Sequence, residues 1–113
     1  MASTPKNELL PGTLECLILA TLRREPLHGY AIAQRIQQNS GELLQAEEGS
    51  LYPALQRLLI KGWVSAEWGT SARNRRVRVY TLTAAGRKQL TGEMKRMGRV
   101  IDGISRIMRL CES

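Results

Sequence analysis

Four side chains in residues 50–61 have the chemistry needed to bind nucleic acid. A phenol, an amide, a guanidinium and an ammonium, at Tyr52, Gln56, Arg57 and Lys61, would lie on the outward side of a helix about three turns long. Such groups bind phosphates and base edges in the DNA major groove. An ordinary solvated helix face has the same composition, so this segment alone leaves both interpretations open.

A second group of basic side chains follows within a short stretch. Arg73, Arg75, Arg76 and Arg78 lie within six positions, between two runs rich in aromatic and β-branched residues at 63–68 and 77–82. These runs predict a β-hairpin whose tip, residues 69–76, is basic. On a hairpin that projects from a helical core, the arginines would reach a minor groove or a row of phosphates. The alternative is a solvated loop that is basic for solubility.

The helix over residues 50–61 is predicted from its ends and its apolar spacing. Ser50 is expected to cap the first turn, and Pro53 to lie within that turn, where a missing backbone N–H costs little. Gly62 would end the helix because glycine enters the left-handed conformation without a Cβ penalty. One apolar stripe would face the core, made of Leu51, Leu55, Leu58 and Leu59.

Two shorter helices are expected before it, at residues 13–24 and 30–39. Thr13 would cap the first, whose apolar residues cover more than one face and predict a central, mostly buried helix. His28, just before the second, is expected to be a capping or turn residue rather than a catalytic base. The second helix would turn Tyr30, Ile32, Ala33 and Ile36 towards the core. With residues 50–61 these helices would make a three-helix unit. Its last two members are expected to be arranged as in a helix-turn-helix, with a longer connection than the simplest version.

A long final helix is expected from a cap at Thr83 to about Cys111. Its apolar residues alternate at spacings of four and three, which is a heptad seam. So long a helix cannot bury this seam on a small domain, and it therefore needs a partner helix. The competing interpretation is a membrane-surface helix whose other face holds Lys95, Arg96, Arg99, Arg106 and Arg109. The seam residues expected to dimerise are Leu90, Met94, Met97, Ile101, Ile104, Met108 and Cys111.

The length of the chain predicts one domain with one protruding element, and its charge indicates the kind of partner. The chain has 113 residues, a net charge of +7 and an isoelectric point near 10.1. Residues 1–56 hold four basic and six acidic side chains, a balance of −2, whereas residues 57–113 hold thirteen and four, a balance of +9. This asymmetry indicates a polyanion partner. We expect a flexible N-terminus at 1–8, a DNA-binding domain at 9–83 and a dimerisation helix at 84–113.

Enzyme chemistry is not indicated. The sequence has one histidine, no carboxylates at acid/base spacing, no phosphate-cradling glycine loop and no metal-ligand pattern, so no cofactor or metal is expected. Cys16 and Cys111 lie in apolar helical patterns and are expected to be structural thiols. No stretch is long and apolar enough for a membrane span or a signal peptide, which predicts a cytoplasmic protein.

The chain resembles the PadR-like transcriptional regulators, a winged helix-turn-helix family. The resemblance spans residues 9–90, and the run Leu51-Tyr52-Pro53-Ala54-Leu55 after a small residue is its most specific part. The other matching segments are Leu14 to Leu22, His28-Gly29-Tyr30, Arg57-Leu58, Gly62, Arg75-Arg76, Tyr80 to Thr83 and Gly86. One C-terminal helix is present, as in the short branch of the family.

The resemblance implies a homodimeric repressor that binds an inverted-repeat operator, with release by a small-molecule effector in some members. Ser50, Tyr52, Pro53 and Arg57 would then contact DNA from the recognition helix, and Arg73, Arg75 and Arg76 would form the wing. His28, Gly29 and Tyr30 would lie at or under a phosphate-facing corner. For an effector, Met94 and Met97 with Trp63 or Trp68 are a candidate lining; the alternative is that these residues only form core and seam. A winged-helix module for protein interaction or RNA association is the alternative function.

Overall fold

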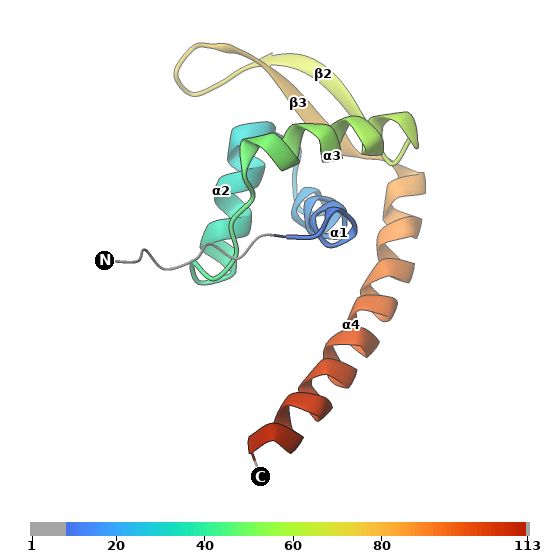
Figure 1. Cartoon of the computed structure of the whole chain (residues 1–113). Helices are drawn as coiled ribbons and strands as arrows, with labels where there is room; N and C mark the ends of the chain where they lie inside the picture. Colours follow the sequence, from blue (N-terminus) through green and yellow to red (C-terminus); the bar gives the residue numbers. More distant parts are fainter. Residues whose placement is uncertain (1–8, 113) are drawn as a thin grey trace, which may run out of the picture.

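Helices and a small antiparallel sheet alternate along the chain in the predicted order (Figure 1). The structure is a computed structural model that describes residues 9–112, so the segment 1–8 expected to be flexible lies outside the described residues. The elements are α1 (Pro11–Leu22), β1 (Leu27–His28), α2 (Gly29–Asn39), α3 (Glu48–Ile60), β2 (Val64–Thr70), β3 (Arg76–Leu82) and α4 (Ala84–Glu112). The expected mainly helical fold with a small hairpin is confirmed.

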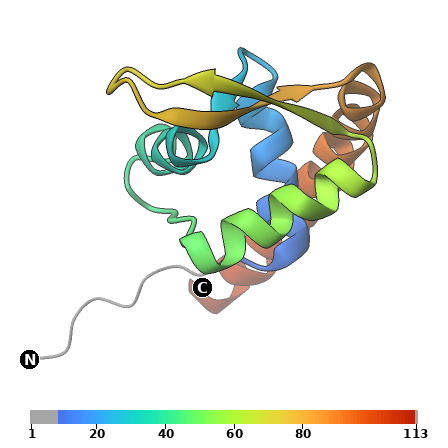
Figure 2. The same ribbon diagram turned by 90° about the horizontal axis from the view of Figure 1, so that it is seen from above.

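The core forms around α1, which contacts α2, α3, α4 and β3 (Figures 1 and 2). Its apolar residues are buried on several sides, as expected of a central helix. Burial of such side chains contributes about 1.5–3 kcal/mol each, which makes this cluster the main source of stability. The largest fully buried side chains are Leu14, Ile18, Leu19, Ile32, Leu51, Leu55 and Leu58.

The sheet has three strands in the order β1-β3-β2. The predicted hairpin pairs β2 with β3 from Val64 opposite Leu82 to Thr70 opposite Arg76. Arg76 therefore lies on a strand rather than at the tip, and Arg78 lies on a strand as expected. The third strand, β1, places His28 opposite Val79. Two residues are too few to show an alternating pattern, and β1 was therefore not predicted.

Two expected helix starts are wrong. Leu10 is the N-cap of α1, with Pro11 following it, so Thr13 lies inside the helix and does not cap it. Glu47 is the N-cap of α3, and its carbonyl accepts from the backbone N–H groups of Ser50 and Leu51 at 3.0 and 2.8 Å. Ser50 therefore lies within the first turn and is not the cap.

Two further positions also differ from expectation. Pro53 is an interior residue of α3, where its ring leaves the carbonyl of Gly49 without the usual helical donor. Both residues are exposed, so water can satisfy that carbonyl. Tyr30 was expected in the core, yet it is 60% exposed, while Ile32 and Ile36 of the same helix are buried.

The expected cap of α4 at Thr83 is confirmed, and it also joins two elements. The Thr83 hydroxyl accepts from the backbone N–H of Gly86 at 3.0 Å and donates to the carbonyl of Gly62 at 2.7 Å. Gly62 ends the α3 region in the left-handed conformation, with a φ of 75°. One hydroxyl thus ties the start of α4 to the end of the α3 segment.

Replacement of these two residues should give different results. Thr83→Ala is expected to lower the free energy of unfolding by about 1–2 kcal/mol, because it removes a cap and leaves the Gly62 carbonyl without this donor. Ser50→Ala is expected to change it by less than about 0.5 kcal/mol. Urea denaturation of both variants measures the difference; equal losses would show that the N-cap assignments are wrong.

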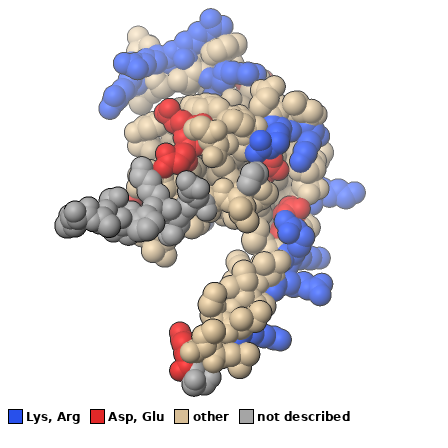
Figure 3. Space-filling view, in the orientation of Figure 1, with Lys and Arg blue, Asp and Glu red and all other residues tan. Residues whose placement is uncertain are grey.

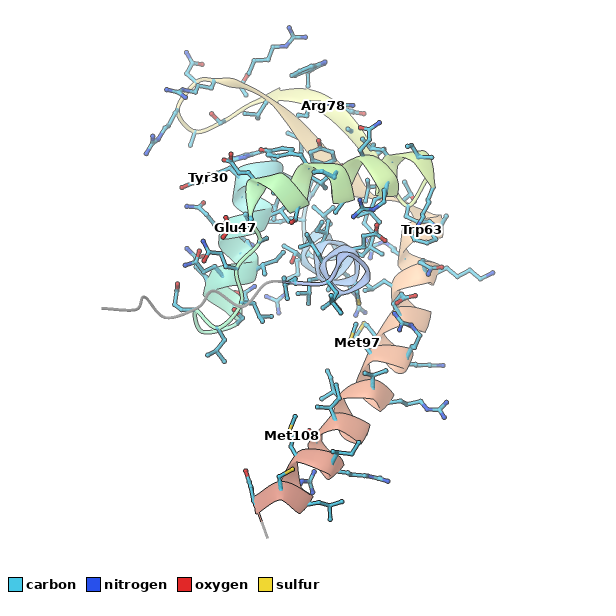
Figure 4. All side chains as sticks on the ribbon, viewed as in Figure 1. Tyr30, Glu47, Trp63, Arg78, Met97 and Met108 are labelled. Carbon is cyan, nitrogen blue, oxygen red and sulfur yellow. The ribbon has the colours of Figure 1, made fainter. Side chains whose placement is uncertain are left out.

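Most of α4 extends away from the other elements (Figure 1). Leu90 is only 2% exposed and belongs to the chain's own core, so its predicted place in a dimer seam is wrong. Met97 also packs partly against that core (Figure 4). Met94, Ile101, Ile104 and Met108 are all at least 50% exposed. Within residues 9–112, no helix has the length and apolar character required to cross a bilayer.

Candidate nucleic-acid interface

A cleft of about 530 Å³ lies between the hairpin and the starts of α2 and α3. We call the hairpin of β2 and β3 the wing; it arches over α2 and α3 (Figures 1 and 2). Several predicted site residues from three separate elements meet in this cleft. Its lining consists of His28, Tyr30, Gln34, Tyr52, Ser71, Ala72, Arg73, Arg75 and Val77.

The start of α2 opens into the cleft. His28 is its N-cap: Nδ1 accepts from the backbone N–H of Ala31 at 3.4 Å, so the expected capping role is confirmed. With Nδ1 as acceptor, the neutral ring carries its proton on Nε2, which remains a donor. A helix start also presents free backbone N–H groups and the positive end of the helix dipole. This corner is therefore suited to an anion such as a phosphate.

Gly29 allows Tyr52 to pack against that corner. A Cβ at Gly29 would lie 2.8 Å from Cε1 and 2.9 Å from the hydroxyl oxygen of Tyr52. The absence of a side chain at Gly29 thus fixes where the phenol sits. Burial raises the pKa of the Tyr52 hydroxyl, and the carboxylate of Glu48 raises it further. The hydroxyl therefore stays protonated at neutral pH and can donate a hydrogen bond.

Tyr52, Pro53 and Gln56 are exposed on one side of α3. Their positions i, i+1 and i+4 place them on neighbouring ridges of the helix. This is the side of α3 that continues from the cleft, since Tyr52 belongs to both.

Arg57 and Lys61 do not belong to that side. Nε of Arg57 lies 2.5 Å from one carboxylate oxygen of Glu15 in α1, and Nζ of Lys61 lies 3.6 Å from the other. Nζ of Lys61 also lies 4.8 Å from the ring centre of Trp63. The side chains of Arg57 and Lys61 remain 42% and 45% exposed, so both reach the surface as predicted. They do so on another flank of α3 than Tyr52 and Gln56, where they join α3 to α1.

The four wing arginines are divided between two faces of the hairpin. Arg73 and Arg75 line the cleft, whereas Arg76 and Arg78 lie against Trp68. Basic side chains, all of them arginines, cover the wing (Figure 3), and Arg78 is labelled among them in Figure 4. The predicted cluster of arginines at the wing is present, although its members do not share one surface.

Hydrogen bonds hold the tip of the wing in one shape. The backbone N–H of Ser71 donates to the carbonyl of Arg75 at 2.8 Å, and its hydroxyl accepts from the backbone N–H of Arg75 at 3.2 Å. Asn74 takes the left-handed conformation, with a φ of 60°. Ser71 and the cleft residue Gln34 were not predicted as site residues, because neither side chain stands out from ordinary polar surface in the sequence.

Trp63 and Trp68, the two tryptophans considered for an effector site, lie in different parts of the structure. Trp68 lies on the wing beside two arginines, whereas Trp63 packs partly against the core. The two tryptophans therefore have different environments.

The two cysteines also differ in environment. Cys16 is buried, which raises the pKa of its thiol, and Cys111 is exposed. Neither cysteine forms a disulfide.

The sequence and the fold of this chain are similar to those of known proteins. The family model for the transcriptional regulator PadR-like family matches residues 18–92. The negative transcriptional regulator PadR of Bacillus subtilis is 29% identical over 77 residues, which is 68% of this chain and 42% of that protein. The solved structure of smu.1704 from Streptococcus mutans superposes with a TM-score of 0.75 at 30% identity, covering 88% of this chain and 92% of that one.

One similar structure contains DNA. It is the crystal structure of Bacillus subtilis PadR in complex with operator DNA, which matches with a TM-score of 0.64 at 27% identity over 72% of this chain and 47% of that one. The chain thus spans less than half of the PadR protein that it matches. These likenesses confirm a winged-helix fold with a C-terminal helix. Because the family model covers well over half of the chain, the protein belongs to the PadR-like family of transcriptional regulators.

Proposed function

We propose that the protein is a homodimeric repressor that binds an inverted-repeat operator. In this proposal residues 9–83 bind DNA and α4 pairs two copies. The observation that carries it is the cleft, in which an exposed α3 edge, the start of α2 and two wing arginines converge. A complex of Bacillus subtilis PadR with operator DNA supports the choice of duplex DNA as the ligand. Repression would follow from occupation of a promoter.

The cleft is suited to a DNA strand that runs between the wing and α3. Arg73 and Arg75 would contact its phosphates, together with the start of α2 at His28, Gly29 and Tyr30. Tyr52, Pro53 and Gln56 would then face the edges of bases in the major groove. Ser50 stays a prediction at the edge of this surface, and Arg57 and Lys61 are assigned to the joint between α3 and α1.

The exposed apolar face of α4 supports pairing of two copies. Apolar side chains at heptad spacing normally pack against a partner helix. In the single chain three of them are more than half exposed, namely Ile101, Ile104 and Met108. Space-filling atoms show basic side chains along the opposite edge of α4 (Figure 3). A second copy of α4 offers an equal apolar surface, and pairing would set two α3 helices one DNA turn apart, about 34 Å.

Charge reversal at two arginines tests the assignment of the cleft. Arg75→Glu is expected to weaken binding to a promoter duplex by about tenfold or more at fixed salt, without lowering the melting temperature, since it loses a phosphate contact. Arg57→Glu is the matched control with the same charge change. It places a carboxylate beside Glu15 and should lower the melting temperature by roughly 4–8 °C, about 1 kcal/mol.

Fluorescence anisotropy with labelled duplex DNA and circular dichroism measure the two quantities. DNA from upstream of the protein's own gene should bind at least ~10³-fold more tightly than arbitrary duplex if the chain reads sequence. Unchanged DNA affinity of the Arg75 variant would contradict the cleft assignment. Equal affinity for all duplexes and for single-stranded RNA would instead indicate a general nucleic-acid or interaction module.

A further inference from the structure

Trp68 has an environment that neither the core nor the cleft explains. It is 61% exposed on β2, yet the guanidinium carbon of Arg76 lies 4.2 Å from its ring centre and that of Arg78 lies 5.9 Å away. Both distances are within the range of a cation–π interaction. One exposed indole therefore holds two arginines of the neighbouring strand.

The register of the wing explains this arrangement. Trp68 pairs with Arg78, and Thr70 pairs with Arg76, so these side chains project from the same face of β2 and β3. Arg75 directly precedes Arg76, and Val77 lies between Arg76 and Arg78. Both Arg75 and Val77 line the cleft, which lies on the opposite face of the wing. Because side chains alternate along a strand, the wing has a basic surface on both faces.

Contact with the indole leaves these guanidinium groups able to bind phosphate. A guanidinium that contacts an aromatic ring through its flat face keeps its N–H donors, which point outward in its plane, available to other groups. Among residues 9–112, no carboxylate forms an ion pair with Arg76 or Arg78. The ring limits the rotamers that a free arginine would otherwise sample, so less order is lost when a phosphate binds.

We propose that Trp68 is a positioning residue that holds Arg76 and Arg78 as a second phosphate-binding surface of the wing. We call Trp68, Arg76 and Arg78 the outer triad. The outer triad contacts the DNA backbone on the side of the wing that faces away from the cleft. Arg73 and Arg75 contact the backbone inside the cleft, so the wing is held between two sets of phosphates. This inference rests on the proposed DNA-binding function and adds a division of labour within it.

A substitution series at Trp68 separates its aromatic face from its bulk. We expect Trp68→Ala to weaken binding about five- to tenfold on a fluorescein-labelled duplex of about 40 base pairs selected by the protein from a random library. Trp68→Leu keeps an apolar side chain without a π face and should behave like the alanine variant. Trp68→Tyr keeps a ring and should stay within about twofold of the unmodified protein. Since Trp68 is exposed, the melting temperatures should stay similar.

A mutant cycle shows whether Trp68 acts through the arginines. The double variant Arg76→Gln/Arg78→Gln should reduce the slope of log affinity against log salt by about two, since each phosphate contact contributes about 0.9. Trp68→Ala added to that double variant should cause no further loss.

Several results would overturn the inference. Additive losses in the cycle would mean that Trp68 acts independently of the arginines. Affinity unchanged in Trp68→Ala, or equal effects of leucine and tyrosine, would also exclude the positioning role. If the unmodified protein binds no duplex at all, the proposed function fails; if it binds and only the Trp68 series is silent, the outer triad alone is refuted.

Discussion

The double substitution Ile101→Glu/Ile104→Glu is expected to make the protein monomeric. It should also lower the affinity for an inverted-repeat operator by at least ~100-fold. Both side chains are slightly more than half exposed on the face of α4 that would pair with a second copy. Four carboxylates brought together across the pair would lose hydration and repel one another. A monomer reads only one half-site, so the gain from two linked contacts is lost.

Sedimentation velocity and a gel shift at fixed salt measure the two effects. The matched control is Arg99→Gln/Arg106→Gln, which changes the net charge by the same amount on the opposite edge of α4. That control should remain a dimer, because Arg99 and Arg106 lie away from Ile101 and Ile104 around the helix. A glutamate variant that stays dimeric would show that α4 does not pair through this face.

Gly86→Ala is expected to lower the free energy of unfolding by about 3 kcal/mol or more, which corresponds to a fall in melting temperature of more than roughly 10 °C. A Cβ at this position would lie 2.0 Å from the carbonyl oxygen of Trp63 and 2.7 Å from Cδ1 of Leu82. The first of these is a backbone atom that also accepts from the N–H of Thr83 at 3.1 Å. It cannot move aside without disturbing the joint between β2 and α4.

Gly92→Ala provides the control for this prediction. Gly92 lies in the same helix, and nothing lies within 4 Å of the Cβ that alanine would add. Alanine is favoured over glycine in a helix interior by about 1 kcal/mol, so this variant should be slightly more stable than the unmodified protein. Thermal unfolding followed by circular dichroism compares the two. Similar stabilities for both variants would mean that α4 does not approach Trp63 as closely as the structure shows.

Most of the elements and most of their buried faces could be predicted from the sequence, although β1 and two helix starts could not. The leucine spacing from Leu51 to Leu58 specified the core side of α3, and the alternating runs around the arginines specified the wing. The cap of α4 at Thr83 and the exposed face from Ile101 to Met108 also followed from local pattern. These features depend on residues within about one or two turns of each other. The local periodicity of apolar residues in the sequence therefore predicts them.

The composition of the site could only be decided by the tertiary structure. Arg57 pairs with Glu15, 42 positions earlier, so no local pattern could show that this arginine turns away from the α3 edge. The reason that Gly29 is needed lies in Tyr52 on another helix, and Leu90 was removed from the seam by packing against the core. The wing register divided four neighbouring arginines between two faces. The sequence determined which faces are apolar or basic. The packing of distant elements decided which charged side chains are left unpaired, because an ion pair depends on separation in space and not along the chain.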